Sequence, residues 1–330
     1  MTAGVHFAGE FLDVYPYMSW IFLLNQEGDL LYCRTDELIG DNQAAHDALF
    51  RQARTESVPR VERDYGLIEL PTKSFRRLAR LADKSKFCDL RFFYSNIFCG
   101  SEDGLQFLSF DASSEQVVEE RKLTDAPIAS LAAKFMTVFA ASLEQRVTTL
   151  FDVSSGGYSR IALTGSTATR VGISDTTVNY YFGSKELSLS GYSRSRVEQS
   201  AESTAESDLE KIDAINESLD YDGNVDDVDF IFNSNRGIFL VKGERLEYRM
   251  NNGNVHTFDL GFNGKLIRAH SFAGLRCYEF LEGLYVTEGR GVRRLLEGEC
   301  ISSRGYANSV NYRNSVSAVN DSGAYIFRLD

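Results

Sequence analysis

A short pattern recurs seven times along this chain: an apolar strand, a turn, and a second strand of alternating residues. The first copy joins residues 21–24 to 29–33, and the second joins 97–99 to 104–108. The remaining copies begin at Val138, Tyr180, Ile238, Leu284 and Val316. Where no insert intervenes, successive copies begin about 40 residues apart, which is the length of a repeat of four strands. The chain is therefore predicted to repeat one small β-sheet.

The strand pattern is regular from residue 93 onward, where Ser, Gly and Asp turns separate short strands. Strands are expected at 137–141, 146–153, 158–163 and 169–174. Apolar and polar residues alternate imperfectly, as expected of sheets that are covered on both faces. We therefore predict an all-β fold, a seven-bladed β-propeller formed by residues 1–330 as a single domain. Two loop inserts, at 41–72 and 195–229, interrupt the repeat, and parts of them are expected to be helical.

The two ends of the chain are expected to share one sheet. The chain stops at Asp330, after the third strand of the seventh copy, and residues 4–8 offer a spare strand before the first copy. Pairing the two would remove the exposed edges that a ring of blades otherwise leaves. The last blade is therefore predicted to be composite.

In period and strand pattern, nearly the whole chain resembles the WD40-like propeller superfamily. The resemblance is architectural, since the Gly-His and Trp-Asp dipeptides of that superfamily are missing and the only tryptophan, Trp20, precedes Ile21. It implies a platform for protein partners, names no subfamily, and leaves six or eight blades open.

The cysteines and histidines do not indicate a metal centre or disulfides. Five cysteines are dispersed without a Cys-x-x-Cys pair, and this pattern suits a reducing compartment. The four histidines lack the spacing of metal ligands. The N-terminal stretch carries Glu10 and Asp13 without a basic leader, and no apolar run approaches the roughly 20 residues of a membrane span. We expect an intracellular protein, cytoplasmic or nuclear, without a metal or cofactor.

Nearly all of the net charge lies in the second insert, which we call the acidic insert. Residues 198–229 contain twelve acidic residues and Lys211, a net charge of −11 against −12 for the whole chain. Leu209, Ile212 and Leu219 fall on one stripe of a helix, which indicates an amphipathic helix that docks either on the propeller or on a partner. A solvated, mostly disordered loop fits the composition equally well.

The first insert, which we call the basic insert, introduces the opposite charge. Residues 51–91 contain eleven basic and six acidic residues. A helix is expected to begin near Asp41 or Asn42, and a later segment is expected to be a second helix or a strand edge with exposed basic positions. The candidate partner-binding residues of that later segment are Arg76, Arg77 and Arg80. They could bind an acidic partner or a phosphorylated peptide, or be balanced by the acidic insert of the same molecule. Direct nucleic-acid binding is not expected, because the excess is modest and the isoelectric point is about 5.0.

Three further arginines, Arg290, Arg293 and Arg294, lie in a turn and strand of the sixth copy. They could form a local site for an anion or an acidic peptide, or equally be solvated charges at the rim. No catalytic residue is indicated, because the nucleophile-elbow and phosphate-loop motifs are absent. The turns that end at Gly104 and Gly323 are interpreted as structural.

The leading hypothesis is a non-catalytic scaffold for protein–protein interactions, a subunit or adaptor of a multi-protein complex. Its expected partners are other protein subunits or peptides, and the sequence leaves a small-molecule ligand unspecified. One alternative is a propeller hydrolase or lyase with its site at the central channel. Another is an acidic mimic, in which residues 198–229 bind a basic partner.

Overall fold

The computed structural model describes strands from almost every part of the sequence. The described residues are 3–50, 66–134, 137–142, 147–152, 158–162, 170–174, 177–182, 185–190, 230–234, 237–250, 252–259, 266–272, 275–288, 291–306, 309, 311–312 and 315–329. The chain forms two compact units. Unit 1 contains Met1–Lys84, Gly243–Arg245 and Phe258–Asp330, and unit 2 contains Ser85–Lys242 and Leu246–Thr257. The described part of the chain is all-β apart from three short helical segments.

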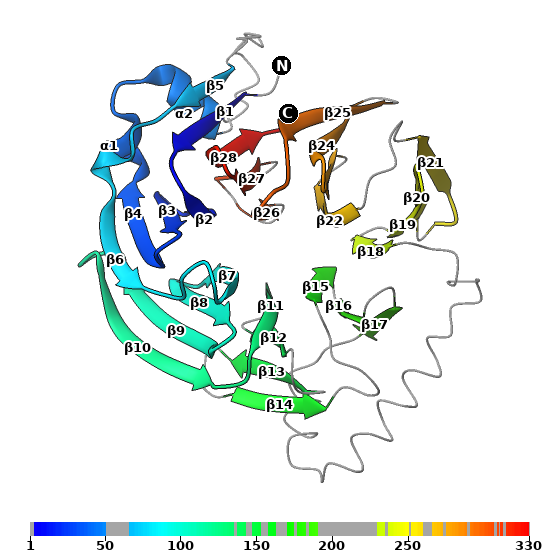
Figure 1. The fold of residues 1–330 in the computed structure, drawn as a ribbon, viewed down its shortest axis with the longest axis horizontal. Helices are drawn as coiled ribbons and strands as arrows, with labels where there is room; N and C mark the ends of the chain where they lie inside the picture. Colours follow the sequence, from blue (N-terminus) through cyan, green and yellow to red (C-terminus); the bar gives the residue numbers. More distant parts are fainter. Residues whose placement is uncertain are drawn as a thin grey trace. The chain divides into compact units, whose positions relative to one another are not determined.

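Unit 1 holds three antiparallel or mixed sheets (Figure 1). The first sheet consists of β2 (Phe11–Tyr17), β3 (Trp20–Asn25), β4 (Asp29–Arg34) and β6 (Arg76–Arg80). The sixth sheet consists of β22 (Leu266–Phe272), β23 (Leu275–Phe280), β24 (Gly283–Glu288) and β25 (Gly291–Glu297). The closing sheet consists of β26 (Ser302–Gly305), β27 (Ser315–Asn320), β28 (Gly323–Arg328), β1 (Ala3–Ala8) and β5 (Leu67–Glu69). The closing sheet packs against both others, through β2 on one side and β22 on the other.

Unit 2 repeats the same order of strands. One sheet of unit 2 consists of β7 (Phe87–Phe93), β8 (Asn96–Ser101), β9 (Gly104–Asp111) and β10 (Gln116–Thr124). The next consists of β11 (Ile128–Lys134), β12 (Thr137–Ser142), β13 (Val147–Asp152) and β14 (Tyr158–Ala162). A third has β15 (Arg170–Ser174), β16 (Thr177–Phe182) and β17 (Lys185–Ser190) in the described residues. The last, mainly in unit 2, consists of β18 (Phe230–Ser234), β19 (Gly237–Lys242), β20 (Arg245–Met250) and β21 (Val255–Asp259).

The predicted sharing of one sheet by the two chain ends is confirmed. Strand β1 pairs antiparallel with β28, from Ala3 opposite Arg328 to Ala8 opposite Gly323. The basic insert then adds β5, which pairs in parallel with β1 on its other edge. The closing sheet therefore has five strands in the order β26-β27-β28-β1-β5.

Six of the seven predicted hairpins are the second and third strands of their sheets, such as β3–β4 and β27–β28. The sixth prediction is shifted by one strand, because its two segments are β24 and β25, the third and fourth strands. The second strand of that sheet, β23, was missed because Arg276 and Glu279 interrupt its apolar pattern. Gly283 marks the true turn: its φ is +144°, as Gly323 has +148° at the same place in the closing sheet. The described residues form seven sheets, and the number of blades stays a prediction.

The basic insert is folded where the structure describes it. Helix α1 (Thr35–Ile39) follows β4 just before the insert, α2 (Gln43–Leu49) begins the insert, and the 3-10 helix η1 (Thr72–Ser74) lies at its end and precedes β6. Helix α2 begins as predicted after Asn42, whose side-chain oxygen accepts a hydrogen bond from the Ala45 N–H at 3.1 Å. Of the two structures predicted for the segment around Arg76, the strand edge is the correct one.

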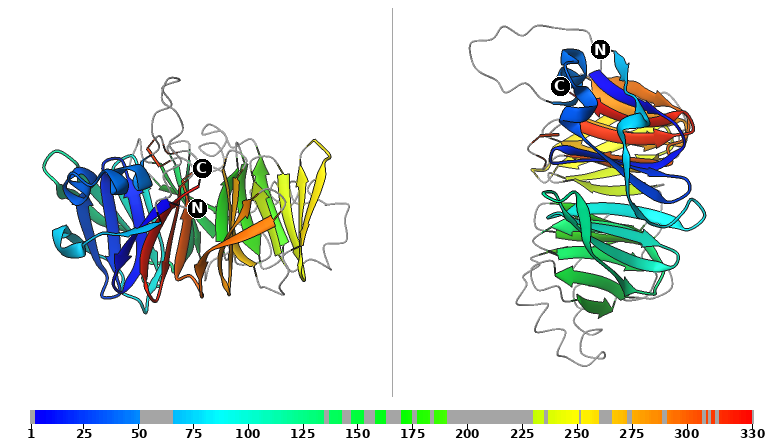
Figure 2. Two further views of the ribbon diagram at one scale, coloured as in Figure 1. Left: turned by 90° about the horizontal axis from the view of Figure 1, so that it is seen from above. Right: turned by 90° about the vertical axis from the view of Figure 1, so that its left-hand side faces the viewer.

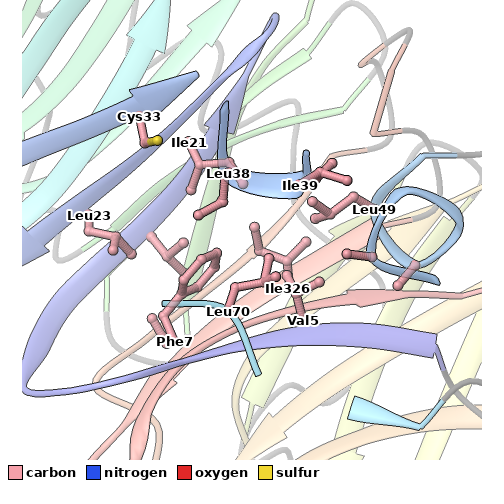
Figure 3. Packing of buried hydrophobic residues seen from close by; sticks show 14 of the residues in the cluster. Val5, Phe7, Ile21, Leu23, Cys33, Leu38, Ile39, Leu49, Leu70 and Ile326 are labelled. Carbon is pink, nitrogen blue, oxygen red and sulfur yellow. The ribbon is translucent and has the colours of Figure 1, made fainter. Parts of the chain in front are cut away.

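A hydrophobic cluster joins the basic insert to both chain ends (Figure 3). Leu49 and Leu70 of the insert are buried against Val5 of β1 and Ile326 of β28, and Ile39 of α1 completes this group. Helix α2, blue in Figure 2, packs against β1 and β28, and α1 packs against α2. The insert therefore covers the seam at which β1 meets β28.

The acidic insert lies outside the described residues, and so does the helix predicted through Leu209, Ile212 and Leu219.

Candidate partner-binding surface

Strand β6 carries the three arginines that the sequence singles out, and it forms the edge of the first sheet in the described residues. It pairs antiparallel with β4, but a β-bulge at Leu78 interrupts the register between Leu30 and Leu31. Arg77 stands opposite Leu31 and Arg80 opposite Asp29, so the bulge brings both arginines to the same face of the sheet. Without the bulge, residues three apart on a strand would point to opposite faces.

Asp29 receives both of these arginines. Its Oδ1 lies 3.0 Å from Arg77 Nε and 3.4 Å from Arg80 Nη1. The Asp29 side chain is 21% exposed, whereas each arginine side chain is 56% exposed. Two guanidinium groups thus share one carboxylate at the solvent surface, and the group keeps one net positive charge.

Arg76 points to the other face of the sheet, where it stands opposite Tyr32. Its guanidinium carbon lies 4.9 Å from the centre of the Tyr32 ring, and its Nη2 lies 3.5 Å from Glu37 Oε2. The stacking and the ion pair hold a side chain that is 47% exposed. The arginines of β6 are therefore positioned by contacts inside the molecule while their outer atoms face solvent.

The other candidate arginines lie elsewhere. Arg293 and Arg294 are on β25 of the sixth sheet, where Arg294 Nη2 lies 3.2 Å from Glu297 Oε2. Arg290 and the apolar residues Leu209, Ile212 and Leu219 lie outside the described residues. Strands β6 and β25 belong to separate sheets of unit 1. The closing sheet packs against both of these sheets, through β2 and β22.

A buried polar network that the sequence analysis did not find connects the closing sheet to the first sheet. Arg304 of β26 forms an ion pair with Asp13 of β2, and both side chains are almost fully buried, at 3% and 1% exposed. The hydroxyl of Ser302 also donates to Asp13 at 3.2 Å, and the Arg304 guanidinium lies over the Tyr15 ring at 5.1 Å. A buried charge pair of this kind needs both partners, because either one alone would be an uncompensated charge.

In unit 2, an aspartate at the equivalent position of a first strand also connects two sheets. Asp89 of β7 accepts a hydrogen bond from the Leu131 N–H at 2.8 Å, and Arg91 donates to the Leu131 carbonyl at 2.8 Å. Leu131 belongs to β11, the first strand of the next sheet. Asp13 and Asp89 each follow a bulge in the first strand of their sheet. The signal in the sequence is a repeated Phe-x-Asp, at residues 11–13 and 87–89, followed by an apolar residue.

Burial dominates the shifted pKa values near these networks. Burial raises the pKa of Tyr306 well above its ordinary value, with a further contribution from Tyr15, and the Tyr306 hydroxyl lies 2.9 Å from that of Ser317. Burial also raises the pKa of the Cys277 thiol well above its ordinary value, with smaller contributions from Cys300 and Glu279. A thiol with a raised pKa is a poor nucleophile at neutral pH.

Among the described residues, no three His, Cys, Asp or Glu side chains are grouped so that they could hold a metal ion. In the same part of the chain, no helix has both the length and the apolar character needed to cross a membrane. The turns at Gly104 and Gly323 connect second to third strands of their sheets, in agreement with their structural interpretation.

No protein-family model matches the sequence, and no curated protein is similar to it. Solved structures match along almost the whole chain. The WD40 domain of Neurospora crassa Pan2 is 8% identical over 97% of this chain and 89% of its own, with a TM-score of 0.55. A chain of the mitotic checkpoint complex is 9% identical over 94% of this chain and 84% of its own, also with a TM-score of 0.55. The fold is that of a WD40-like β-propeller.

A third similar structure is that of the computationally designed Ika8 protein, which is 9% identical over the full length of both chains with a TM-score of 0.55. The TM-scores show that the fold is shared, and at identities of 8–9% the similarity assigns no activity to this chain.

Proposed function

We propose that this propeller is a non-catalytic scaffold for protein–protein interactions, a subunit or adaptor of a multi-protein complex. The observation that carries the proposal is the arginine edge of β6, where Arg77 and Arg80 are held by Asp29 and remain more than half exposed. Arginine suits this role because its planar group binds a partner carboxylate through two parallel hydrogen bonds. A chain of the mitotic checkpoint complex has the same fold, which supports a role in an assembly.

Further contacts are proposed at Arg76, next to this pair, and at Arg290, Arg293 and Arg294. The apolar residues Leu209, Ile212 and Leu219 of the acidic insert are proposed to contact a partner as well. Arg76 is restrained by Tyr32 and Glu37, so it would bind with little loss of side-chain freedom.

The compartment is proposed to be intracellular, cytoplasmic or nuclear. All five cysteines lie in the described residues as thiols, and four of them are buried. A chain with this cysteine usage suits a reducing environment.

The alternative of a propeller enzyme requires acidic or histidine side chains to be available on the first strands of the sheets. Asp13 and Asp89, on two of these strands, are 1% and 8% exposed and are used for contacts between sheets. These two carboxylates therefore favour a structural role, and the scaffold stays the preferred proposal.

Affinity purification from the native host, followed by mass spectrometry, tests the proposal. Three forms of the chain are compared: the full chain, the chain without residues 198–229, and the variant with Arg76, Arg77 and Arg80 all replaced by glutamine. We expect the full chain to recover a partner in stoichiometric amount that co-elutes with it in size-exclusion chromatography. At least one of the two altered forms should recover less of this partner. If the full chain elutes alone and retains no partner, the scaffold proposal is wrong.

A further inference from the structure

The backbone edge of β6 is the outermost part of the first sheet in the described residues. Edge strands carry N–H and C=O groups that can pair with another extended chain. Arg76, Arg77 and Arg80 of β6 are exposed, whereas Leu78 and Ala79 are partly buried. A partner strand could therefore approach this edge along a strand whose long side chains already extend into solvent.

Charge decides which partner such an edge accepts. All charged side chains of β6 are basic. The comparable edge strand of unit 2, β10, carries Glu119 and Glu120 together with Arg121 and Lys122, and its register is broken by two bulges. Like charges directly opposite each other on paired strands are destabilising, so two copies of β6 repel each other. An acidic strand would gain from the same arrangement.

The bulge at Leu78 determines which positions of a partner strand would lie beside Arg77 and Arg80. Arg77 and Arg80 lie on one face and share Asp29, which leaves this pair with an excess positive charge. A strand paired with β6 would place every second side chain on that face. Glutamate or aspartate at alternate positions would then lie beside the two guanidinium groups.

We propose that β6 is a docking edge for an extended acidic segment of a protein partner, which adds to the first sheet as a fifth strand. Main-chain hydrogen bonds to the edge hold the segment, and Arg77 and Arg80 select acidic residues at alternate positions. This inference rests on the proposed scaffold function and specifies the chemistry of one partner contact.

The test uses a fluorescein-labelled synthetic nonapeptide in which glutamate and valine alternate, with the full-length chain in fluorescence anisotropy at about 50 mM salt, where surface charges are weakly screened. The double variant Arg77→Gln/Arg80→Gln should weaken binding about threefold to tenfold, since exposed ion pairs contribute little each. The matched control, Arg121→Gln/Lys122→Gln on the edge of β10, should change binding less than twofold. Circular dichroism melts confirm that both variants fold.

A second peptide separates strand addition from attraction by charge alone. It has the same sequence with N-methyl groups on one central valine and on the adjacent glutamate, so both edges of the peptide lose an N–H donor while every carboxylate is kept. We expect it to bind at least threefold more weakly than the unmodified peptide. Equal binding of the two peptides would overturn strand addition, and undiminished binding by the β6 variant, or no binding by the native chain, would overturn the docking edge. The scaffold proposal would survive these results if affinity purification still recovered a stoichiometric partner.

Discussion

Replacing Gly323 by alanine should detach the N-terminal strand from the closing sheet. The backbone at Gly323 has a φ of +148°, a conformation that side chains of L residues rarely adopt, and holding alanine there costs about 1–3 kcal/mol. The added Cβ would lie 2.3 Å from the carbonyl oxygen of Phe7. That oxygen belongs to β1 and cannot move without shifting the strand, which costs about 1–3 kcal/mol more. The total, about 2–6 kcal/mol, is a large part of the 5–15 kcal/mol that stabilises a typical folded protein.

Thermal unfolding followed by circular dichroism measures this loss, and a destabilisation of this size should lower the melting temperature by on the order of 10 °C. Gly66→Ala is the matched control, because no atom of the described residues lies within 4 Å of a Cβ placed there. It should change the stability by less than about 0.5 kcal/mol.

Deleting residues 1–12 gives a sharper comparison. The deletion removes β1 and should itself lower the melting temperature substantially, because it exposes the edge of β28. It also removes the Phe7 carbonyl, so Gly323→Ala should now cost only the part that comes from φ, about 1–3 kcal/mol. An equal effect of Gly323→Ala in both backgrounds would refute the assigned contact with β1.

Three other substitutions test contacts described above. Arg304→Met should destabilise the fold by about 3–5 kcal/mol in urea denaturation, because it leaves the buried Asp13 carboxylate without its charged partner, and adding Asp13→Leu should recover part of this loss. A single variant as stable as the native chain would contradict the pairing. Hydrogen bonds from the Ser113 N–H and hydroxyl lower the pKa of Asp111 from 3.8 to about 2, so Ser113→Ala should raise it in a carboxyl NMR titration. Because this pKa is lowered in the folded state, the stabilisation is complete above the ordinary value and is lost as the pH falls through about 2. Asn42→Ala should destabilise α2 by about 1 kcal/mol in hydrogen exchange, whereas Asn42→Asp keeps the cap and should have little effect.

The sequence was sufficient for the repeat and for closure by the chain ends, because both depend on local patterns of apolar residues. It failed at β23, where Glu279 is 1% exposed and accepts a hydrogen bond from the Ser303 hydroxyl. A buried glutamate looks like a surface residue until its partner on another sheet is known. The Phe-x-Asp motif was present twice, but only the structure shows that Asp13 and Asp89 bind the neighbouring sheet.

The sequence predicted a strand edge with exposed basic positions around Arg76, but it did not predict the acidic residues that pair with these arginines. Counting charges between residues 51 and 91 leaves out Asp29 and Glu37, which precede this segment in the sequence. Pairing of β4 with β6 brings Asp29 next to Arg77 and Arg80. Such long-range pairing cannot be read from local composition, so the number of basic residues did not reveal how they are held.

The pairing of β1 on both edges has a consequence for the order in which the chain folds during synthesis. His6 and its neighbours pair with β5, which ends at Glu69, but Val5 also pairs with Ile326, which the ribosome synthesises only after the other six sheets. Strand β5, with Leu49 and Leu70 of the basic insert, can therefore cover β1 before the later sheets have been synthesised. The late strand β28 would then enter a site that has already been assembled, which shortens the time that an apolar edge is open to other nascent chains.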